Sequence, residues 1–330
     1  MGITMKDIAE IVGVSESTVS RAINNKAGVG ENTKQEILAV AKKYNFRPNQ
    51  LARNLAKQST NMLGLILPDI SSLFYSEVAK GIQDVARKND YQLILCNTDN
   101  DSQEEKDYID WMQNNKIAGI IFLGKGLDND QIIKLGLSDY PLVLADRLIE
   151  ELMIPSVIID NNTGAYNATK HLINKGYKKI ALINGPKKEL HSQSRLQGYK
   201  NALADFGIDF KLEFVLNKEL TREGGYQSFL ELIELKEPPT AIFAANDLLA
   251  VGLVEAIKTA GYLIPQDIAV VGFEDTIVTS IINPSLTTVA QPMYQLGVTS
   301  AQKLLSLIAD KELKEQIEIL ETELIIRDST

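Results

Sequence analysis

The sequence predicts an α/β protein in two parts: a small all-α head with a helix-turn-helix, and a two-lobed core of doubly wound parallel sheets. Apolar residues recur at helical spacing through residues 1–46. From residue 61 onward, short runs rich in Val, Ile and Leu alternate with amphipathic helical segments. Such alternation is typical of parallel sheets covered by helices on both faces. It occurs twice over similar lengths, and therefore indicates two lobes.

The head begins with a stretch, residues 4–25, typical of two short helices joined by a tight turn. Gly13 interrupts the apolar periodicity and can take the positive φ at which the first helix ends. Ser15 can accept a hydrogen bond from a free N–H that opens the second helix. The apolar positions expected in the core of this helix pair are Ile8, Ala9, Ile11, Val12, Val19, Ala22 and Ile23.

The second helix leaves short hydrogen-bonding side chains and one guanidinium on its outer face. Such groups suit contacts with base edges and phosphates in the major groove of double-stranded DNA. The alternative is an ordinary helical hairpin with a solvated second helix. The head residues that we expect to contact DNA are Thr4, Ser15, Glu16, Ser17, Thr18, Ser20, Arg21 and Asn24.

A third amphipathic helix follows at residues 31–44, with Ile37, Leu38, Val40 and Ala41 as its expected core stripe. Pro48 favours a break, and Asn49 can cap a short fourth helix at residues 50–57. That segment has little apolar surface to bury, so it should not hold a helix alone. We therefore expect a head at 1–46, a hinge helix and linker at 47–60, and a core at 61–330.

Three motifs of this region resemble one family, the lactose/galactose repressor (LacI–GalR) family of bacterial transcription regulators. They are T-x-x-D-I-A from Thr4, V-S-x-S-T-V-S-R-x-I-N from Val14, and R-P-N-x-L-A-R-x-L from Arg47. The resemblance implies a homodimer whose paired hinge helices enter the minor groove at the centre of a pseudo-palindromic operator. It also implies that a hinge leucine wedges between base steps, a device that bends DNA. The matching hinge residues are Asn49, Ala52 and Leu55.

Charge is distributed unevenly along the chain, whose net charge is −9. Residues 1–60 hold nine Lys and Arg against five Asp and Glu, and the remainder holds 25 against 38. A basic head on an acidic body is consistent with DNA binding by the head alone. Because the head is only mildly basic, groove and hinge contacts must supplement phosphate attraction.

Composition excludes several other classes. We expect no signal peptide and no membrane-spanning segment, because no apolar stretch approaches the required length. The one cysteine, Cys96, cannot form an intramolecular disulfide and fits a reducing cytoplasm. We therefore expect the chain to be cytoplasmic and associated with the nucleoid. Gly124-Lys125-Gly126 is too short for a phosphate-binding loop, and His171 and His191 form no metal set. We therefore expect no cofactor and no metal.

The core is expected to follow a strand–helix rhythm. Strands are predicted at 62–69, 91–97, 117–123, 140–146, 157–161, 179–185, 213–217, 240–247 and 268–275. Helices are predicted at 74–89, 102–115, 129–136, 162–175, 192–207, 223–235, 247–260 and 293–309. The family resemblance implies two lobes of the periplasmic-binding-protein type with a cleft between them, joined by three crossovers near residues 160, 291 and 321.

Polar residues follow several of the predicted strands. In open parallel sheets, ligands bind beyond the carboxyl ends of the strands, where these residues lie. Carboxylates and amides suit a polyhydroxylated ligand, because each hydroxyl both donates and accepts. Phe74 and Tyr75 could stack on a sugar ring, and Arg195 could bridge two hydroxyls, a carboxylate or a phosphate. An Asp or Asn after a strand can also be a simple helix cap.

The resemblance assigns the ligand site residue by residue. Asp146, Arg195 and Asn246 match ligand-binding positions of the family, whereas Glu274 stands where the family usually has aspartate. Either Glu274 or the adjacent Asp275 could take that role. Leu220 stands where the family often has an aromatic residue, which favours a smaller or non-ring ligand. The expected effector site is Asp69, Phe74, Tyr75, Asp146, His191, Arg195, Asn246, Glu274 and Gln291.

The chain is thus expected to be a dimeric, cytoplasmic, sequence-specific repressor whose operator affinity changes with a small sugar or sugar derivative. An enzyme such as a sugar kinase with a DNA-binding head is disfavoured by the missing phosphate loop. A third reading is a catabolite-control-type regulator that uses a phosphorylated carrier protein as corepressor. Residues 68–82 and 289–297 look similar to that branch of the family, although both stretches are shared more widely.

Overall fold

The computed structural model describes residues 3–23, 25–46, 60–149, 152 and 154–330. The chain separates into two compact units, Met1–Thr60 and Asn61–Thr330. The predicted contacts of Asn24, Asn49, Ala52 and Leu55, and the predicted hinge helix, lie outside the described residues.

The described residues of the first unit form three helices that pack around a small core. They are α1 (Met5–Val12), α2 (Glu16–Ile23) and α3 (Glu31–Lys43). Gly13 ends α1 with φ of 74°, and the Ser15 hydroxyl accepts from the N–H of Thr18 at 3.2 Å, so both predicted turn features are confirmed. The side chains buried completely or nearly so are Ile8, Ala9, Val19, Ala22 and Ile37.

Two residues predicted for the core of this unit lie on its surface. Ile11 is 53% exposed and Leu38 is 42% exposed. Ile8 and Ile37 are fully buried and define the inward faces of α1 and α3. Ile11 lies at the edge of the apolar stripe that runs through Ile8 and Val12, and Leu38 lies one residue past Ile37, the centre of the apolar stripe of α3. The core of the three helices is too small to cover residues at these edges.

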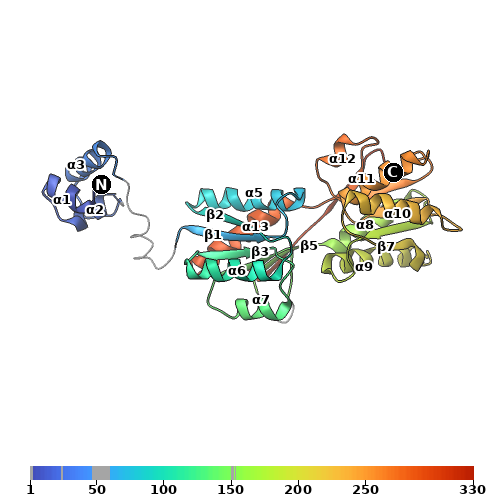
Figure 1. Cartoon of the computed structure of the whole chain (residues 1–330), viewed down its shortest axis with the longest axis horizontal. Helices are drawn as coiled ribbons and strands as arrows, with labels where there is room; N and C mark the ends of the chain where they lie inside the picture. The colour runs from blue at the N-terminus through green and yellow to red at the C-terminus, as the bar shows by residue number, and fades with distance from the viewer. Residues whose placement is uncertain (1–2, 24, 47–59, 150–151, 153) are drawn as a thin grey trace. The chain divides into compact units, whose positions relative to one another are not determined.

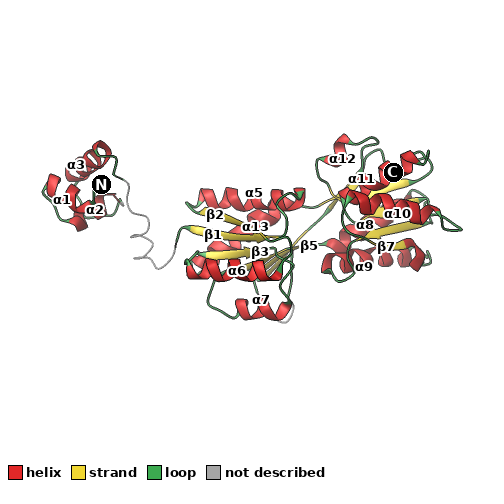
Figure 2. Cartoon of the chain, viewed as in Figure 1, coloured by secondary structure: helices red, strands yellow, loops and turns green. Residues whose placement is uncertain are grey.

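The second unit has two lobes, each with one six-stranded sheet between layers of helices (Figure 2). The first lobe has the strand order β11-β5-β4-β3-β1-β2, and all five pairings are parallel. Its strands are β1 (Met62–Leu67), β2 (Gln92–Asn97), β3 (Gly119–Phe122), β4 (Leu142–Ala145), β5 (Ser156–Ile159) and β11 (Ile317–Leu320). Its helices are α5 (Leu73–Lys88), α6 (Ser102–Asn114), α7 (Asn129–Gly136) and α13 (Met293–Ile308).

The second lobe repeats this arrangement with the strand order β12-β10-β9-β8-β6-β7. Its strands are β6 (Ile180–Asn184), β7 (Val215–Asn217), β8 (Ala241–Ala244), β9 (Ala269–Glu274), β10 (Thr287–Ala290) and β12 (Glu323–Ile325). Its helices are α8 (Asn161–Asn174), α9 (Leu190–Asp205), α10 (Arg222–Ile233), α11 (Asp247–Thr259) and the short α12 (Val278–Ile281). A single 3-10 turn, η1, spans Leu212–Phe214.

Each sheet buries both of its faces, as its uninterrupted apolar strands predict. In β1, Leu63, Leu65 and Leu67 pack toward α5 and α13, while Ile66 packs toward α6 and α7. The second sheet likewise has one core against α10 and α11 and another against α8 and α9. The prediction of doubly wound sheets is confirmed, with one exception: β12 pairs with β10 in the antiparallel sense.

The chain passes three times between the lobes: at Asp160 between β5 and α8, at Gln291–Pro292 between β10 and α13, and at Glu321–Thr322 between β11 and β12. Helix α13, drawn in orange-red in Figure 1, therefore lies among the blue and green elements of the first lobe and packs against α5. The last stretch of the chain forms two strands, one in each lobe, on either side of the crossover expected near residue 321. A turn at Glu321–Thr322 separates them, because β11 completes one sheet and β12 the other.

Candidate functional site

A cavity of about 460 Å³ lies between the two lobes, at the carboxyl ends of their central strands. Both sheets change winding direction between two central strands, β1 and β3 in the first lobe and β6 and β8 in the second. Such switch points leave a crevice beyond the strand ends, which is where ligands bind in open α/β sheets. We call this cavity the interlobe cleft. It is lined by all of the predicted effector residues, Asp69, Phe74, Tyr75, Asp146, His191, Arg195, Asn246, Glu274 and Gln291.

Arg195 is held on the floor of the interlobe cleft by neutral partners. Its Nε donates to Asn161 Oδ1 at 2.9 Å, and its Nη1 donates to the carbonyl of Ala245 at 2.6 Å. The guanidinium also lies over the Phe273 ring, 4.1 Å from the centroid. Neither of these hydrogen-bond acceptors is a carboxylate. Burial lowers the pKa of Arg195, while Glu274 and Asp146 act in the opposite direction.

Asp146 follows β4 and reaches the cleft from the first lobe. Its backbone has φ of 55°, a left-handed conformation that Asp tolerates better than most residues. One carboxylate oxygen, Oδ2, lies 3.4 Å from His191 Nε2 in the second lobe. The other oxygen, Oδ1, is buried and has no hydrogen-bond partner. Burial lowers the pKa of His191, and the Asp146 charge only partly offsets this effect, so the imidazole is neutral at pH 7.

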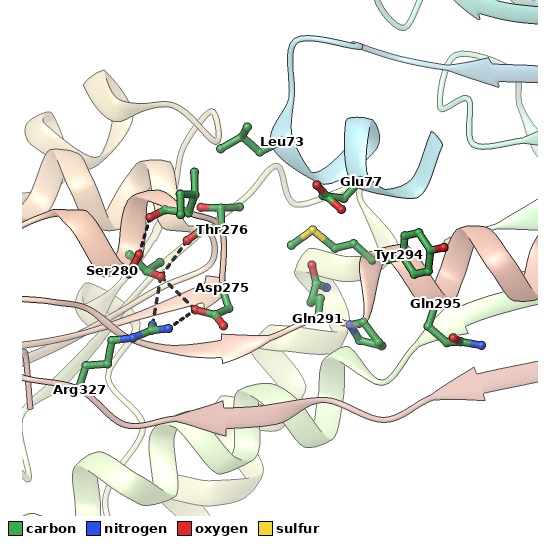
Figure 3. Close-up of a pocket in the computed structure, with 13 residues that line it drawn as sticks. Leu73, Glu77, Asp275, Thr276, Ser280, Gln291, Tyr294, Gln295 and Arg327 are labelled. Carbon is green, nitrogen blue, oxygen red and sulfur yellow. Dashed lines mark hydrogen bonds and ion pairs between the residues drawn. The ribbon is translucent and has the colours of Figure 1, made fainter. Parts of the chain in front are cut away.

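Glu274 is the last residue of β9, Asp275 follows it, and their side chains point into different cavities. Glu274 lines the interlobe cleft, whereas Asp275 lines a different cavity, where its Oδ1 accepts from Arg327 Nη2 at 2.7 Å (Figure 3). The structure therefore favours Glu274 as the cleft carboxyl. Burial, with the nearby Asp247 carboxylate, raises the pKa of Glu274 to about 8. Its φ of 115° is a strained value for a residue with a side chain.

The side-chain amides of Asn246 and Gln291 in the cleft differ in how many of their polar atoms are hydrogen-bonded to the protein. Asn246 is the N-cap of α11: its Oδ1 accepts from the N–H of Leu249 at 2.9 Å, and its Nδ2 donates to the Leu220 carbonyl at 3.2 Å. Gln291 lies at the second crossover, and its Oε1 is buried without a partner. Gln291 is thus freer than Asn246 to bind a ligand, since both polar atoms of Asn246 already have protein partners.

An aromatic pair forms the first-lobe wall of the cleft. The Phe74 and Tyr75 rings meet edge to face with centroids 5.1 Å apart, near the start of α5. Burial raises the pKa of Tyr75 to about 12. Leu220 lines the opposite wall, so the second lobe offers an aliphatic side chain there.

Three charged residues that line the cleft were not predicted, namely Lys125, Glu189 and Glu219. Lys125 follows β3 in the first lobe, Glu189 is the N-cap of α9 in the second, and Lys125 Nζ lies 3.0 Å from Glu189 Oε2. In the sequence, Gly124-Lys125-Gly126 is too short for a phosphate-binding loop, and no other role is predicted for it. The signal was present, because this segment follows a central strand as Asp146 does.

The head offers a polar face along α2. Glu16, Ser17 and Arg21 are exposed, and Thr18 and Ser20 are half-buried. Thr4 caps α1 reciprocally with Asp7, since the Thr4 N–H donates to Asp7 Oδ2 at 2.8 Å and the Asp7 N–H donates to the Thr4 hydroxyl at 3.3 Å. Thr4 and Ser15 therefore have structural roles as helix caps, whatever else they contact.

Other chemistries have little support in the described residues. No group of three His, Cys, Asp or Glu side chains among them could hold a metal ion. Cys96 is buried, and burial raises its pKa to about 11, so its thiol is inert. In the same described part of the chain, no helix combines the length and apolarity needed to cross a membrane.

A helix-turn-helix head and a two-lobed core with a polar cleft define a class, the DNA-binding regulator that carries a ligand-binding domain. The comparisons agree with this assignment. Residues 4–49 match the family model for bacterial regulatory proteins of the lacI family. Residues 60–327 match the model for periplasmic binding proteins and the sugar binding domain of the LacI family. The chain belongs to the LacI family, so the predicted family is confirmed.

Relatives match along the full length of the chain. It is 36% identical over 331 residues to the HTH-type transcriptional regulator RegA of Clostridium saccharobutylicum, with 100% of both chains covered. It is 34% identical to catabolite control protein A of Priestia megaterium, with 94% of each covered. A solved Lac repressor dimer bound to operator and an anti-inducer matches with a TM-score of 0.89 and 26% identity, covering 100% of this chain and 99% of that one. The chain is therefore a transcriptional repressor of this family and not an enzyme.

Proposed function

We propose that the chain is a homodimeric repressor that binds a pseudo-palindromic operator and releases or retains it according to a small carbohydrate-like effector in the interlobe cleft. The observation that carries the effector proposal is a pair of buried oxygens, Asp146 Oδ1 and Gln291 Oε1, that have no partner. A buried acceptor without a donor costs about 1–3 kcal/mol. A hydroxyl-rich ligand would supply donors to both oxygens and acceptors to the Arg195 guanidinium.

The regulatory mechanism is thermodynamic linkage. The effector binds one arrangement of the lobes better than another, and the three crossovers allow the lobes to move relative to each other. If operator affinity differs between those arrangements, effector and operator change each other's affinity by the same factor. A repressor of this kind acts in the cytoplasm at the nucleoid.

On the DNA side, α2 is the proposed recognition helix. Its exposed Ser17 and Arg21 can reach base edges, and Thr18 and Ser20 can reach phosphates. Leu55 is the proposed minor-groove wedge, and Asn49 and Ala52 are the other hinge residues proposed to contact DNA. The basic head supplies the salt-dependent part of the affinity.

The test begins with selection of a binding site from random duplexes, followed by operator titrations by fluorescence anisotropy. Sugars, sugar acids, sugar phosphates and nucleosides are first screened by thermal shift on the full chain. A compound that raises the melting temperature should also change operator affinity. If selection enriches no pseudo-palindrome, the DNA proposal is wrong. If a cleft-binding compound leaves operator affinity unchanged, the linkage is wrong.

A second function is favoured by one observation, the 34% identity to catabolite control protein A. In that case a phosphorylated carrier protein, and not a sugar, would raise operator affinity. A pull-down with the carrier protein, with and without its phosphoserine, separates the two functions. Retention of only the phosphorylated form, together with a stronger operator complex, would support the second.

A further inference from the structure

Two pairs of side chains cross the interlobe cleft and join the lobes directly. Lys125 Nζ in the first lobe lies 3.0 Å from Glu189 Oε2 in the second, and Asp146 Oδ2 lies 3.4 Å from His191 Nε2. We call these four residues the cross-lobe bridge. The first pair is an ion pair, and the second joins a carboxylate to a neutral imidazole. Among the described residues, the remaining ion pairs each lie within a single lobe.

The Lys125 side of the bridge is fixed by its own loop. The buried Glu105 carboxylate accepts the N–H groups of Lys125 and Gly126 at 2.9 Å and of Leu127 at 2.8 Å. Gly124 permits this approach, because a Cβ there would lie 2.5 Å from Glu105 Oε1. The loop is therefore held in one conformation, and Lys125 differs from a mobile surface lysine.

A second clamp acts from the neighbouring strand. Arg147 follows β4 and donates to the carbonyls of Gly124 at 3.2 Å and Leu127 at 2.9 Å. The Arg147 guanidinium thus binds carbonyl oxygens of the loop, whereas the Glu105 carboxylate binds N–H groups of the same loop. With its backbone fixed from both sides, the loop loses little conformational entropy when Lys125 pairs with Glu189, which favours the pair.

The Glu189 side of the bridge is also available for pairing. Glu189 is the N-cap residue of α9, but its side chain does not accept a hydrogen bond from the helix. The Glu189 side chain is 28% exposed and the Lys125 side chain is 30% exposed. A pair at this depth is screened less by salt than an exposed pair. Burial lowers the pKa of Lys125, but Tyr75 and Glu189 together raise it above its ordinary value, so the lysine stays charged.

The bridge lies where a ligand must meet it. A second cavity, of about 510 Å³, adjoins the interlobe cleft. The two cavities share Tyr75 and all four bridge residues as lining. A ligand in the cleft therefore contacts the bridge, and a ligand long enough to reach the second cavity must break it.

We propose that the cross-lobe bridge holds the lobes closed in the absence of effector, with Lys125–Glu189 as its principal contact. The bridge competes with a ligand for Asp146 and Glu189, and so sets the energy that an effector must overcome to rearrange the lobes. The regulatory consequence rests on the proposed function. The bridge itself does not, since it acts in the free protein.

The test measures lobe separation in the free full-length chain, without DNA or effector. Spin labels are placed at Lys134→Cys on α7 and Ala204→Cys on α9, two exposed positions in different lobes. Double electron–electron resonance then gives the interlobe distance distribution. The unmodified chain, whose Cys96 is buried, is the labelling blank.

Lys125→Glu and Glu189→Lys should each shift the distribution to longer distances, with about a fivefold fall in the ratio of closed to open molecules. The double variant Lys125→Glu/Glu189→Lys should restore the original distribution, because it rebuilds the pair with reversed polarity. Lys218→Glu breaks an ion pair with Glu231 inside the second lobe and should leave the distribution unchanged.

Lys125→Met serves as a second variant that removes the charge without placing a carboxylate beside Glu105. It should open the lobes as Lys125→Glu does. The proposal fails if neither single variant changes the distribution, or if the charge-swapped double variant stays as open as the single variants. Neither result bears on operator or effector binding, so it would leave the proposed function intact.

Discussion

Protonation of Glu274 in the cleft should make the stability of the chain depend on pH. Its pKa of about 8 exceeds the ordinary value of 4.5, so the folded chain keeps a proton there that the unfolded chain releases. The free energy of unfolding should therefore fall as pH rises between about 5 and 8, by about 1.4 kcal/mol per pH unit from this group. Below that window both states bind the proton, and above it neither does.

Glu274→Gln should remove this contribution. Relative to wild type, the variant should gain stability as pH rises from about 5 to about 8, and the gain should level off above pH 8. Urea titrations at intervals between pH 5 and 9 measure the difference. Glu234→Gln, at an exposed position of the same lobe, is the control and should follow wild type. Parallel pH profiles for Glu274→Gln and wild type would contradict the assignment.

Arg195→Ala should abolish the effector response and spare operator binding. Losing a charge-assisted fork should cost effector affinity roughly 2–4 kcal/mol, or about 30- to 1,000-fold. The head is a separate unit, so operator affinity without effector should change little. Anisotropy with effector titrated into both proteins is the measurement. Arg222→Ala breaks an exposed pair with Glu255 and should respond as wild type does. A normal response from Arg195→Ala would remove this residue from the site.

Residue types at strand ends predicted much of the cleft, because the carboxyl ends of parallel strands converge at one edge of each sheet. The partners of those residues could not be predicted. Arg195 rests on a carbonyl, an amide and a ring, and this choice depends on where β8 and α8 place their atoms. Lys125 and Glu189 are 64 residues apart and meet only when both lobes are in place.

Helices were predicted to within about two residues of their bounds at most ends, since capping and turn residues mark them locally. The close helix crossings were not predicted. Gly81 of α5 and Gly297 of α13 each face backbone of the opposite helix so closely that a Cβ would overlap it. Nothing local distinguishes these glycines from ordinary ones, because the contact joins segments far apart in the chain.

Gly297→Ala should destabilise the core, since the added methyl would meet the Val78 carbonyl and force α5 and α13 apart. We expect a loss of about 1–3 kcal/mol in the free energy of unfolding, measured by urea denaturation. Gln302→Ala, on the exposed side of α13, is the matched control and should change stability little. A loss equal to that of the control would show that the helices can separate without cost.

In the head, α2 should determine operator discrimination. Arg21→Ala should reduce the preference for operator over random DNA by roughly 1–3 kcal/mol, as the loss of a bidentate base contact would. Lys26→Ala should instead weaken binding evenly across sequences, as the loss of a phosphate contact would. Competition titrations with both DNAs measure the two ratios. An unchanged ratio for Arg21→Ala would show that α2 is oriented differently in the groove.

At the scale of the whole molecule, the alternation of strands and helices was sufficient to predict two doubly wound lobes. The antiparallel pairing of β12 was not predictable, because an edge strand of three residues carries too little pattern to state its direction.

The division of the chain into two compact units predicts how the core should behave without the head. A chain of residues 61–330 should melt as the core of the full protein does and keep its ligand-induced thermal shift, but show no operator binding by anisotropy. A core that fails to fold would show that the head is required for its stability.

Two elements of the first lobe, α13 and β11, come from residues 293–320, near the end of the chain. A ribosome therefore makes all of the second lobe except β12 before the first lobe can be completed. Until then, α5 lacks the helix it packs against and β5 lacks its outer neighbour. The nascent first lobe should need protection from aggregation for most of the time of synthesis, whereas most of the second lobe is contiguous in sequence and can fold earlier. Protease digestion of ribosome-stalled chains ending at residue 292 would detect this order, with the first lobe cleaved and the second largely resistant.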